Sequence, residues 1–205
     1  HDIKNSTTRR PKKKRFFFFV GSGKPVPPKT PNNVRPIIPP ADMKDLKIRV
    51  SQGSRLKTIF EAYGAKPAEF PFGKPLYEAI KSGQFDGQEN PFGNIYTANL
   101  HEVQKYLALT GHQYGLLYPI TGVKTWTKLP RDVRKVIQEV ALEMQDFSME
   151  IGEKLERDYR EKLVQTMQIN QVDTISFLAA SFPIYKKYAA EVPEGKKLIG
   201  LLYDK

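Results

Sequence analysis

The sequence contains no cysteine, and only three histidines and one tryptophan occur among its 205 residues. Without cysteine, the chain has no disulfide, no thiolate metal site and no cysteine nucleophile. No apolar run approaches the roughly 20 residues that a membrane-spanning helix requires. These absences exclude several classes of protein, but they leave the cellular compartment open.

The motifs of several well-known chemistries are missing as well. The three histidines are scattered and show neither the HExxH pattern nor any other metal-ligand spacing. There is no GxSxG elbow, no GxGxxG segment after a strand and no set of kinase motifs. The segment 21–24 resembles a phosphate-binding loop, but Phe18 occupies a required glycine position and Pro25 follows the lysine. The sequence therefore predicts no metal site, no cofactor and no enzyme; an acid–base enzyme is the third hypothesis, because acidic residues are plentiful, but no pair of them stands out.

Acidic residues are scarce at the N-terminal end of the chain. The formal charge is +11, from 33 basic and 22 acidic residues, but residues 1–30 alone hold nine Lys/Arg and one Asp. Eight of the 16 prolines fall within the first 40 positions. We therefore divide the chain into a basic, proline-rich segment of unclear origin, residues 1–31, and a nearly neutral body, residues 32–205. The prolines of the basic segment, the last of which is Pro31, should keep residues 25–31 extended and outside any central strand.

The basic segment also supports an alternative function. The run 9–15 would suit phosphate groups electrostatically, and the four phenylalanines at 16–19 could stack on bases. A tail, an edge strand or a sequence unrelated to the domain explains the same pattern. Binding of nucleic acid or another polyanion through this segment is therefore the alternative hypothesis.

The body alternates between strand and helix signals before it becomes helical. Short strand-like runs occur at 46–50, 65–72 and 85–87, and a longer one spans 103–120. Helical spacing with glycine stops predicts helices over 56–63 and 75–81, and a third helix begins at 90. One long helix is expected over 131–163, followed by helices near 173–190 and 194–203. This order indicates an α/β fold with a mostly parallel sheet and long C-terminal helices.

Several motifs in this order resemble one family, the solute-binding proteins of the tripartite ATP-independent periplasmic (TRAP) transporters. The resemblance covers about residues 32–205. Its strongest segment is Asp86-Gly87-Gln88-Glu89-Asn90-Pro91-Phe92. The other matching segments are Asp42–Val50, Glu102–Leu107, Thr110-Gly111-His112, Trp126 with Leu129-Pro130, Pro183-Ile184-Tyr185 and Val192-Pro193 with Gly195-Lys196.

The resemblance implies a periplasmic receptor whose two α/β lobes close on a small organic acid. Such a receptor delivers the acid to a TRAP membrane permease that an ion gradient drives. On this basis we expect residues 32–205 to form one periplasmic-binding-protein-like lobe, with the first lobe not recognisable. We also expect a monomer that is not an enzyme and does not bind nucleic acid.

The resemblance identifies Arg49 as the arginine that pairs with the ligand carboxylate. A planar guanidinium can give two parallel hydrogen bonds to a carboxylate. Residues near the carboxyl ends of parallel strands face the ligand crevice of such folds. By alternation alone, however, Arg49 could equally be a surface arginine that shares a strand face with Lys47.

Three further ligand contacts are implied. Asn90 matches the family's asparagine near the ligand, although Asn before Pro is also typical of a helix N-cap. Phe72 matches the aromatic that packs on the solute, and it could equally belong to the core. Arg35 lies where a second basic contact could arise, as does Lys29. Glu89 would repel a carboxylate, so we expect it to turn away from the site.

Overall fold

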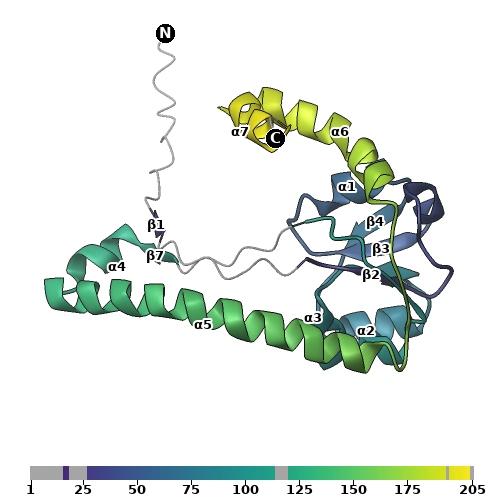
Figure 1. Cartoon of the computed structure of the whole chain (residues 1–205), viewed down its shortest axis with the longest axis horizontal. Coiled ribbons are helices and arrows are strands. Elements are labelled where there is room, and N and C mark those ends of the chain that lie inside the picture. The colour runs from purple at the N-terminus through teal and green to yellow at the C-terminus, as the bar shows by residue number, and fades with distance from the viewer. Residues whose placement is uncertain (1–15, 19–26, 114–119, 193, 204–205) are drawn as a thin grey trace, which may run out of the picture. The chain divides into compact units, whose positions relative to one another are not determined.

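The structure is a computed structural model that describes residues 16–18, 27–113, 120–192 and 194–203 (Figure 1). It divides into two compact units. The larger unit comprises residues 25–115 and 152–205, and the smaller comprises residues 1–24 and 116–151. The boundary that we expected after residue 31 falls inside a strand of the larger unit, β2 (Thr30–Asn32).

A six-stranded sheet forms the centre of the larger unit, in the order β4-β3-β5-β2-β6-β8. The α/β class is confirmed. The sheet is mixed, because β3 runs parallel to β4 and β5, and β6 parallel to β8, whereas β2 is antiparallel to both of its neighbours. Besides β2, the strands are β3 (Lys47–Val50), β4 (Lys66–Glu69), β5 (Gly87–Gln88), β6 (Tyr106–Ala108) and β8 (Gln168–Asn170).

The expectation that Pro31 stays out of a central strand is wrong. Pro31 lies in the middle of β2, between β5 and β6, and pairs in register with Leu107. Proline lacks the backbone N–H and so removes one donor from the sheet. Residues before and after Pro31 still form backbone hydrogen bonds with the segment that contains β5. Lys29 exchanges two backbone hydrogen bonds with Asn90, and the Asn33 amide donates to the Asp86 carbonyl at 2.9 Å. One missing donor between these bonds is therefore tolerated.

Two hydrophobic clusters lie on the sheet. One combines Ile48 and Val50 of β3 with Phe60 of α1 (Leu56–Ala62) and Phe177 of α6 (Thr174–Glu191). The other is formed by α2 (Lys74–Lys81), α3 (Phe92–Thr97), Leu107 and the last turn of α5 (Arg131–Leu163). Figure 1 shows α1 on one side of the strands and α2 and α3 on the other. Since strand side chains alternate, Arg49 faces away from the first cluster.

Short helices and a C-terminal helix complete the larger unit. The 3-10 helix η1 (Pro40–Met43) precedes β3, and η2 (Leu100–Glu102) precedes β6. Helix α7 (Gly195–Tyr203) follows α6, close to the predicted boundaries of both helices. The strand-like interpretation of 103–120 is confirmed for the three residues of β6 and for residue 120, where β7 (Ile120–Gly122) begins, and residues 114–119 lie outside the described part.

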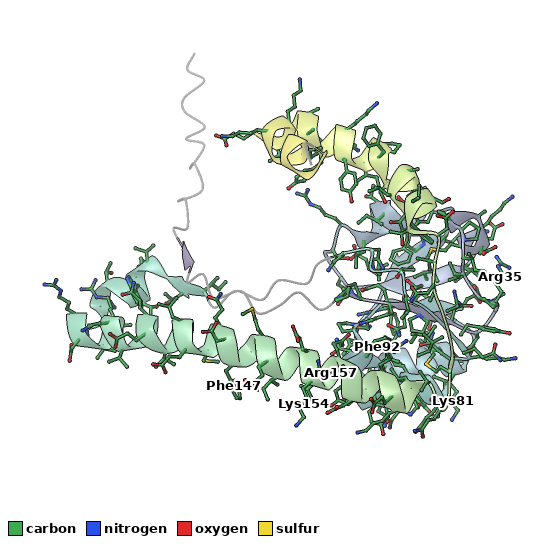
Figure 2. The ribbon with its side chains drawn as sticks, in the orientation of Figure 1. Arg35, Lys81, Phe92, Phe147, Lys154 and Arg157 are labelled. Carbon is green, nitrogen blue, oxygen red and sulfur yellow. The ribbon has the colours of Figure 1, made fainter. Side chains whose placement is uncertain are left out.

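The smaller unit pairs β1 (Phe16–Phe18) antiparallel with β7 (Ile120–Gly122). It continues through α4 (Val123–Lys128) into the first part of α5, which runs through Leu163 as predicted. The apolar stripe of α5 is largely exposed, and Figure 2 shows Phe147 projecting from the helix. No helix among the described residues combines the length and apolarity needed to cross a bilayer.

Candidate anion-binding site

Arg49 is a buried cation with an unused donor. Its side chain is 2% exposed, and its Nε donates to the Phe70 carbonyl at 2.8 Å. The buried Nη1 atom has no hydrogen-bond partner among the described residues. Desolvation lowers the pKa of Arg49, and the nearby charge of Glu89 opposes that shift. A guanidinium stays protonated under any ordinary condition, so this position favours an anion.

The sheet register places Asn90 on the same face as Arg49. Arg49 pairs with Gln88 across the parallel β3/β5 ladder. Paired residues on neighbouring strands point to the same face, and Asn90 comes two positions after Gln88. The isolated bridge between Asn90 and Lys29 holds this position with two backbone hydrogen bonds of 2.9 and 3.1 Å. Arg49 and Asn90 therefore lie near the carboxyl ends of adjacent parallel strands.

Asn90 does not cap α3, which was the alternative role that its position before Pro91 suggested. The N-cap residue is Pro91, and no side-chain capping bond forms there. Instead, the Asn90 Oδ1 accepts a hydrogen bond from Asn94 Nδ2 at 2.9 Å, and its Nδ2 donates to Gln88 Oε1 at 2.5 Å. Pro91 precedes the helix in an extended conformation, with φ −62° and ψ 159°, and the asparagine side chain makes these amide bonds in place of a cap.

Phe72 lies beside Arg49 in the loop between β4 and α2. Its ring centroid is 5.9 Å from the Arg49 guanidinium carbon, which is within the range of a cation–π contact. The side chain is 44% exposed, so Phe72 is not a core residue in this structure. It also borders an open hollow of about 540 Å³ between α2 and α3. Neither Arg49 nor Asn90 lines that hollow.

Glu89 lies on the opposite face, as expected. Glu89 comes two positions after Gly87, so the two residues share a strand face. Gly87 pairs with Ile48, which lies on the face of the first cluster. The Glu89 carboxylate is buried, accepts a 3.4 Å hydrogen bond from Ser51 and lies 3.8 Å from His112 Nε2. Sequence reasoning missed this role of His112, because a histidine without metal spacing carries no local signal of a buried carboxylate partner.

Lys29 and Arg35 have partners within the chain. The Lys29 ammonium donates to Glu156 of α5 and lies 3.6 Å from the centroid of the Phe92 ring. Burial lowers the pKa of Lys29, and Glu156 opposes that shift. Arg35 donates to the carbonyls of Asp42 and Lys44 at 2.8 and 2.9 Å, and Figure 2 places it at the outer edge of the larger unit. The structure thus places Phe72 beside Arg49 and places Asn90 on the same sheet face as Arg49, and Arg35 lies apart from them.

The described residues include no group of three or more His, Asp or Glu side chains that could hold a metal ion. The site instead offers a cation, side-chain amides and an aromatic ring. Such groups bind and orient an anion by charge-assisted hydrogen bonds and stacking.

Comparison with known proteins places the chain in a family. Residues 29–191 match the model of "Bacterial extracellular solute-binding protein, family 7", and the chain belongs to that family. The C4-dicarboxylate-binding periplasmic protein DctP of Vibrio cholerae is 31% identical over 198 residues, which are 93% of this chain and 57% of the relative.

Solved structures of the TRAP periplasmic solute-binding class have the same fold. The protein from Bordetella bronchiseptica, with density assigned to pantoate, is 30% identical and has a TM-score of 0.76, covering 87% of this chain and 59% of that one. The protein from Ochrobactrum anthropi with bound L-fuconate is 26% identical and has a TM-score of 0.79, with coverage of 90% and 61%. The chain thus spans about three fifths of the length of these relatives.

Proposed function

We propose that this chain provides the carboxylate-binding part of a periplasmic receptor that delivers a small organic acid to a TRAP membrane permease. The observation that carries the proposal is the buried Arg49 guanidinium, whose Nη1 has no partner among the described residues. An unpaired buried charge is costly, and a ligand carboxylate would compensate it by a bidentate pair. The named ligands of the relatives, a C4-dicarboxylate, pantoate and L-fuconate, are all acids.

The remaining groups have separate roles in this proposal. Asn90 donates a hydrogen bond to a ligand oxygen beside Arg49, and Phe72 covers the apolar side of the ligand. Arg35 stabilises the fold and does not contact the ligand, because its Nε and Nη2 already donate to the carbonyls of Asp42 and Lys44 at the end of η1. The protein acts by binding and release, as a monomer, and has no chemical step to catalyse.

Titration of the purified 205-residue chain with succinate, pantoate and L-fuconate tests the proposal. Succinamide serves as a control, because it matches succinate in size and carries no charge. At about 100 times the Kd, a bound acid stabilises the folded state by roughly 2.7 kcal/mol, which shifts a thermal melting curve measurably. We expect at least one acid to bind and succinamide to give no shift.

Two variants test the assignment to Arg49. Arg49→Ala should abolish acid binding, whereas Arg35→Ala should lower the melting temperature and leave the affinity for the acid unchanged. Equal binding of succinate and succinamide, or full affinity in Arg49→Ala, would contradict a carboxylate receptor. Turnover of any of the three acids, followed by mass spectrometry of the mixture, would contradict a role limited to binding.

A further inference from the structure

A row of four side-chain amides runs from α3 into the middle of the sheet. Asn94 donates to Asn90 at 2.9 Å, and Asn90 donates to Gln88 at 2.5 Å. Gln88 donates to Gln104 at 3.2 Å, and Gln104 donates to the backbone carbonyl of Pro31 at 3.0 Å. We call these four side chains the amide row.

The carbonyl at the end of the row fixes the direction of every bond in it. The Pro31 carbonyl can only accept a hydrogen bond, so Gln104 must present its NH₂ group to Pro31 and its oxygen to Gln88. Gln88 must then present its NH₂ group to Gln104 and its oxygen to Asn90. The same logic leaves Asn90 with its NH₂ group toward Gln88 and its oxygen toward Asn94. An isolated carboxamide has no such constraint, because its two ends are similar in shape.

Burial strengthens this constraint. Gln88, Gln104 and Asn90 are 0%, 3% and 7% exposed, while Asn94 lies at the exposed end of the row. In a buried position, a reversed amide would leave a donor facing a donor, and a buried polar group without a partner destabilises the fold. Water cannot easily repair the mismatch at the three buried members.

We infer that the amide row is a positioning device, in which Gln88, Gln104 and Asn94 hold the Asn90 carboxamide in one orientation for the ligand. A carboxamide NH₂ group has two N–H donors, and the row uses one of them at Asn90. The second donor is then fixed in direction on the face that Asn90 shares with Arg49. Such a fixed donor selects a ligand with an acceptor oxygen, a second carboxylate oxygen or a hydroxyl, next to the carboxylate that Arg49 binds. The inference rests on the proposed function.

Asn94→Ala is the most direct test, because Asn94 is exposed and its removal should barely affect folding. The Asn90 carboxamide loses one of its two restraints, and the affinity for the acid that binds best in the panel should fall about threefold to tenfold. Ser82→Ala is the matched control. Ser82 is also an exposed helix-end residue whose side chain donates to a helix carbonyl, that of Ala79 at 3.2 Å, and it lies outside the amide row. Its affinity should be unchanged.

Gln104→Met tests the buried end, because methionine has a similar length and no amide. It should lower affinity in the wild-type background and have no effect in an Asn90→Ala background, since nothing is left to position there. This coupling separates positioning from a general loss of stability, which would lower affinity in both backgrounds. Asn94→Ala gives the answer alone if Gln104→Met does not fold.

Two results distinguish the failures. If an acid binds with an affinity that depends on Arg49, but Asn94→Ala and Gln104→Met bind as tightly as wild type, the amide row has no positioning role and the proposed function stands. If the wild-type chain binds none of the acids, the proposed function fails, and the inference fails with it.

Discussion

Replacing Arg49 by lysine keeps the positive charge and removes the planar fork. Lysine offers a compact, strongly hydrated ammonium on a flexible stem, and it cannot form two parallel hydrogen bonds to one carboxylate. In this structure it would also give up the bond from Arg49 Nε to the Phe70 carbonyl, 2.8 Å long. The substitution therefore separates the contribution of charge from that of geometry.

The expected magnitudes differ for ligand and fold. Truncating one member of a buried, hydrogen-bonded charge pair costs about 2–5 kcal/mol, and lysine should fall near the lower end because it still carries a charge. A loss of about 2 kcal/mol corresponds to an affinity loss of about 30-fold. For the fold, a hydrogen bond from a charged group contributes about 1.5–3 kcal/mol, so the free energy of unfolding should also fall.

Calorimetric titration with the acid that binds best, together with urea unfolding of the free protein, measures both quantities. Arg55→Lys is the control, because Arg55 is exposed and its guanidinium carbon lies 4.4 Å from the Tyr188 ring centroid, on another part of the unit. It should change neither quantity by a comparable amount. The reasoning is refuted if Arg49→Lys binds the acid as tightly as wild type, since charge alone would then suffice.

Three further predictions concern the fold. Gly87→Ala should destabilise the protein by about 1–3 kcal/mol, because the new Cβ would lie 2.6 Å from the Pro31 carbonyl oxygen. A Cβ at Gly152 on α5 would meet nothing within 4 Å, so Gly152→Ala should stabilise the protein slightly. Urea unfolding of both variants compares the two free energies. Leu163→Ala should cost about 2–5 kcal/mol because Leu163 is fully buried, and Leu142→Ala, at a position 61% exposed on the same helix, should cost little in the same assay. Hydrogen bonds from Ser176 lower the pKa of Asp173 below its ordinary value of 3.8. The ionised carboxylate therefore stabilises α6 fully above pH 3.8, and this contribution is lost as the pH falls through the lowered pKa. Thermal melts should therefore show that the advantage of wild type over Asp173→Ala shrinks below pH 4, and a constant difference would contradict this assignment.

The sequence was a good guide to elements whose signals are local. The long helix ends at Leu163 as predicted, and α1 and α2 are followed by Gly64 and Gly83 with φ of +85° and +77°, a conformation that favours glycine. Strands β2 and β8 were missed. Both are three residues long and contain proline or polar residues, so only their neighbours in the sheet make them strands. Tertiary context outweighed local propensity there.

The candidate site divides in the same way. Arg49, Asn90 and Phe72 were named through a resemblance, and the residues themselves left each of them with a plausible structural role. The amide row could not be predicted, since Gln104 is 16 residues from Gln88 and 73 from Pro31. Only the alternation of Gln88 and Asn90 along one strand face was visible in the sequence.

Strand β8 has a consequence for how the protein is made. Its partner β6 ends at Ala108, and residues 109–167 must be synthesised before β8 can pair with it. At about 5–20 residues per second, the ribosome needs several seconds for this stretch. During that time β6 has an open edge, and unpaired edges recruit other chains. A nascent or truncated chain that stops before Gln168 presents β6 as the sheet edge, whereas in the whole chain β8, a three-residue strand with the polar residues Gln168 and Asn170, forms that edge. Short, polar edge strands recruit other chains less readily, so the shorter chain should aggregate more readily than the whole chain.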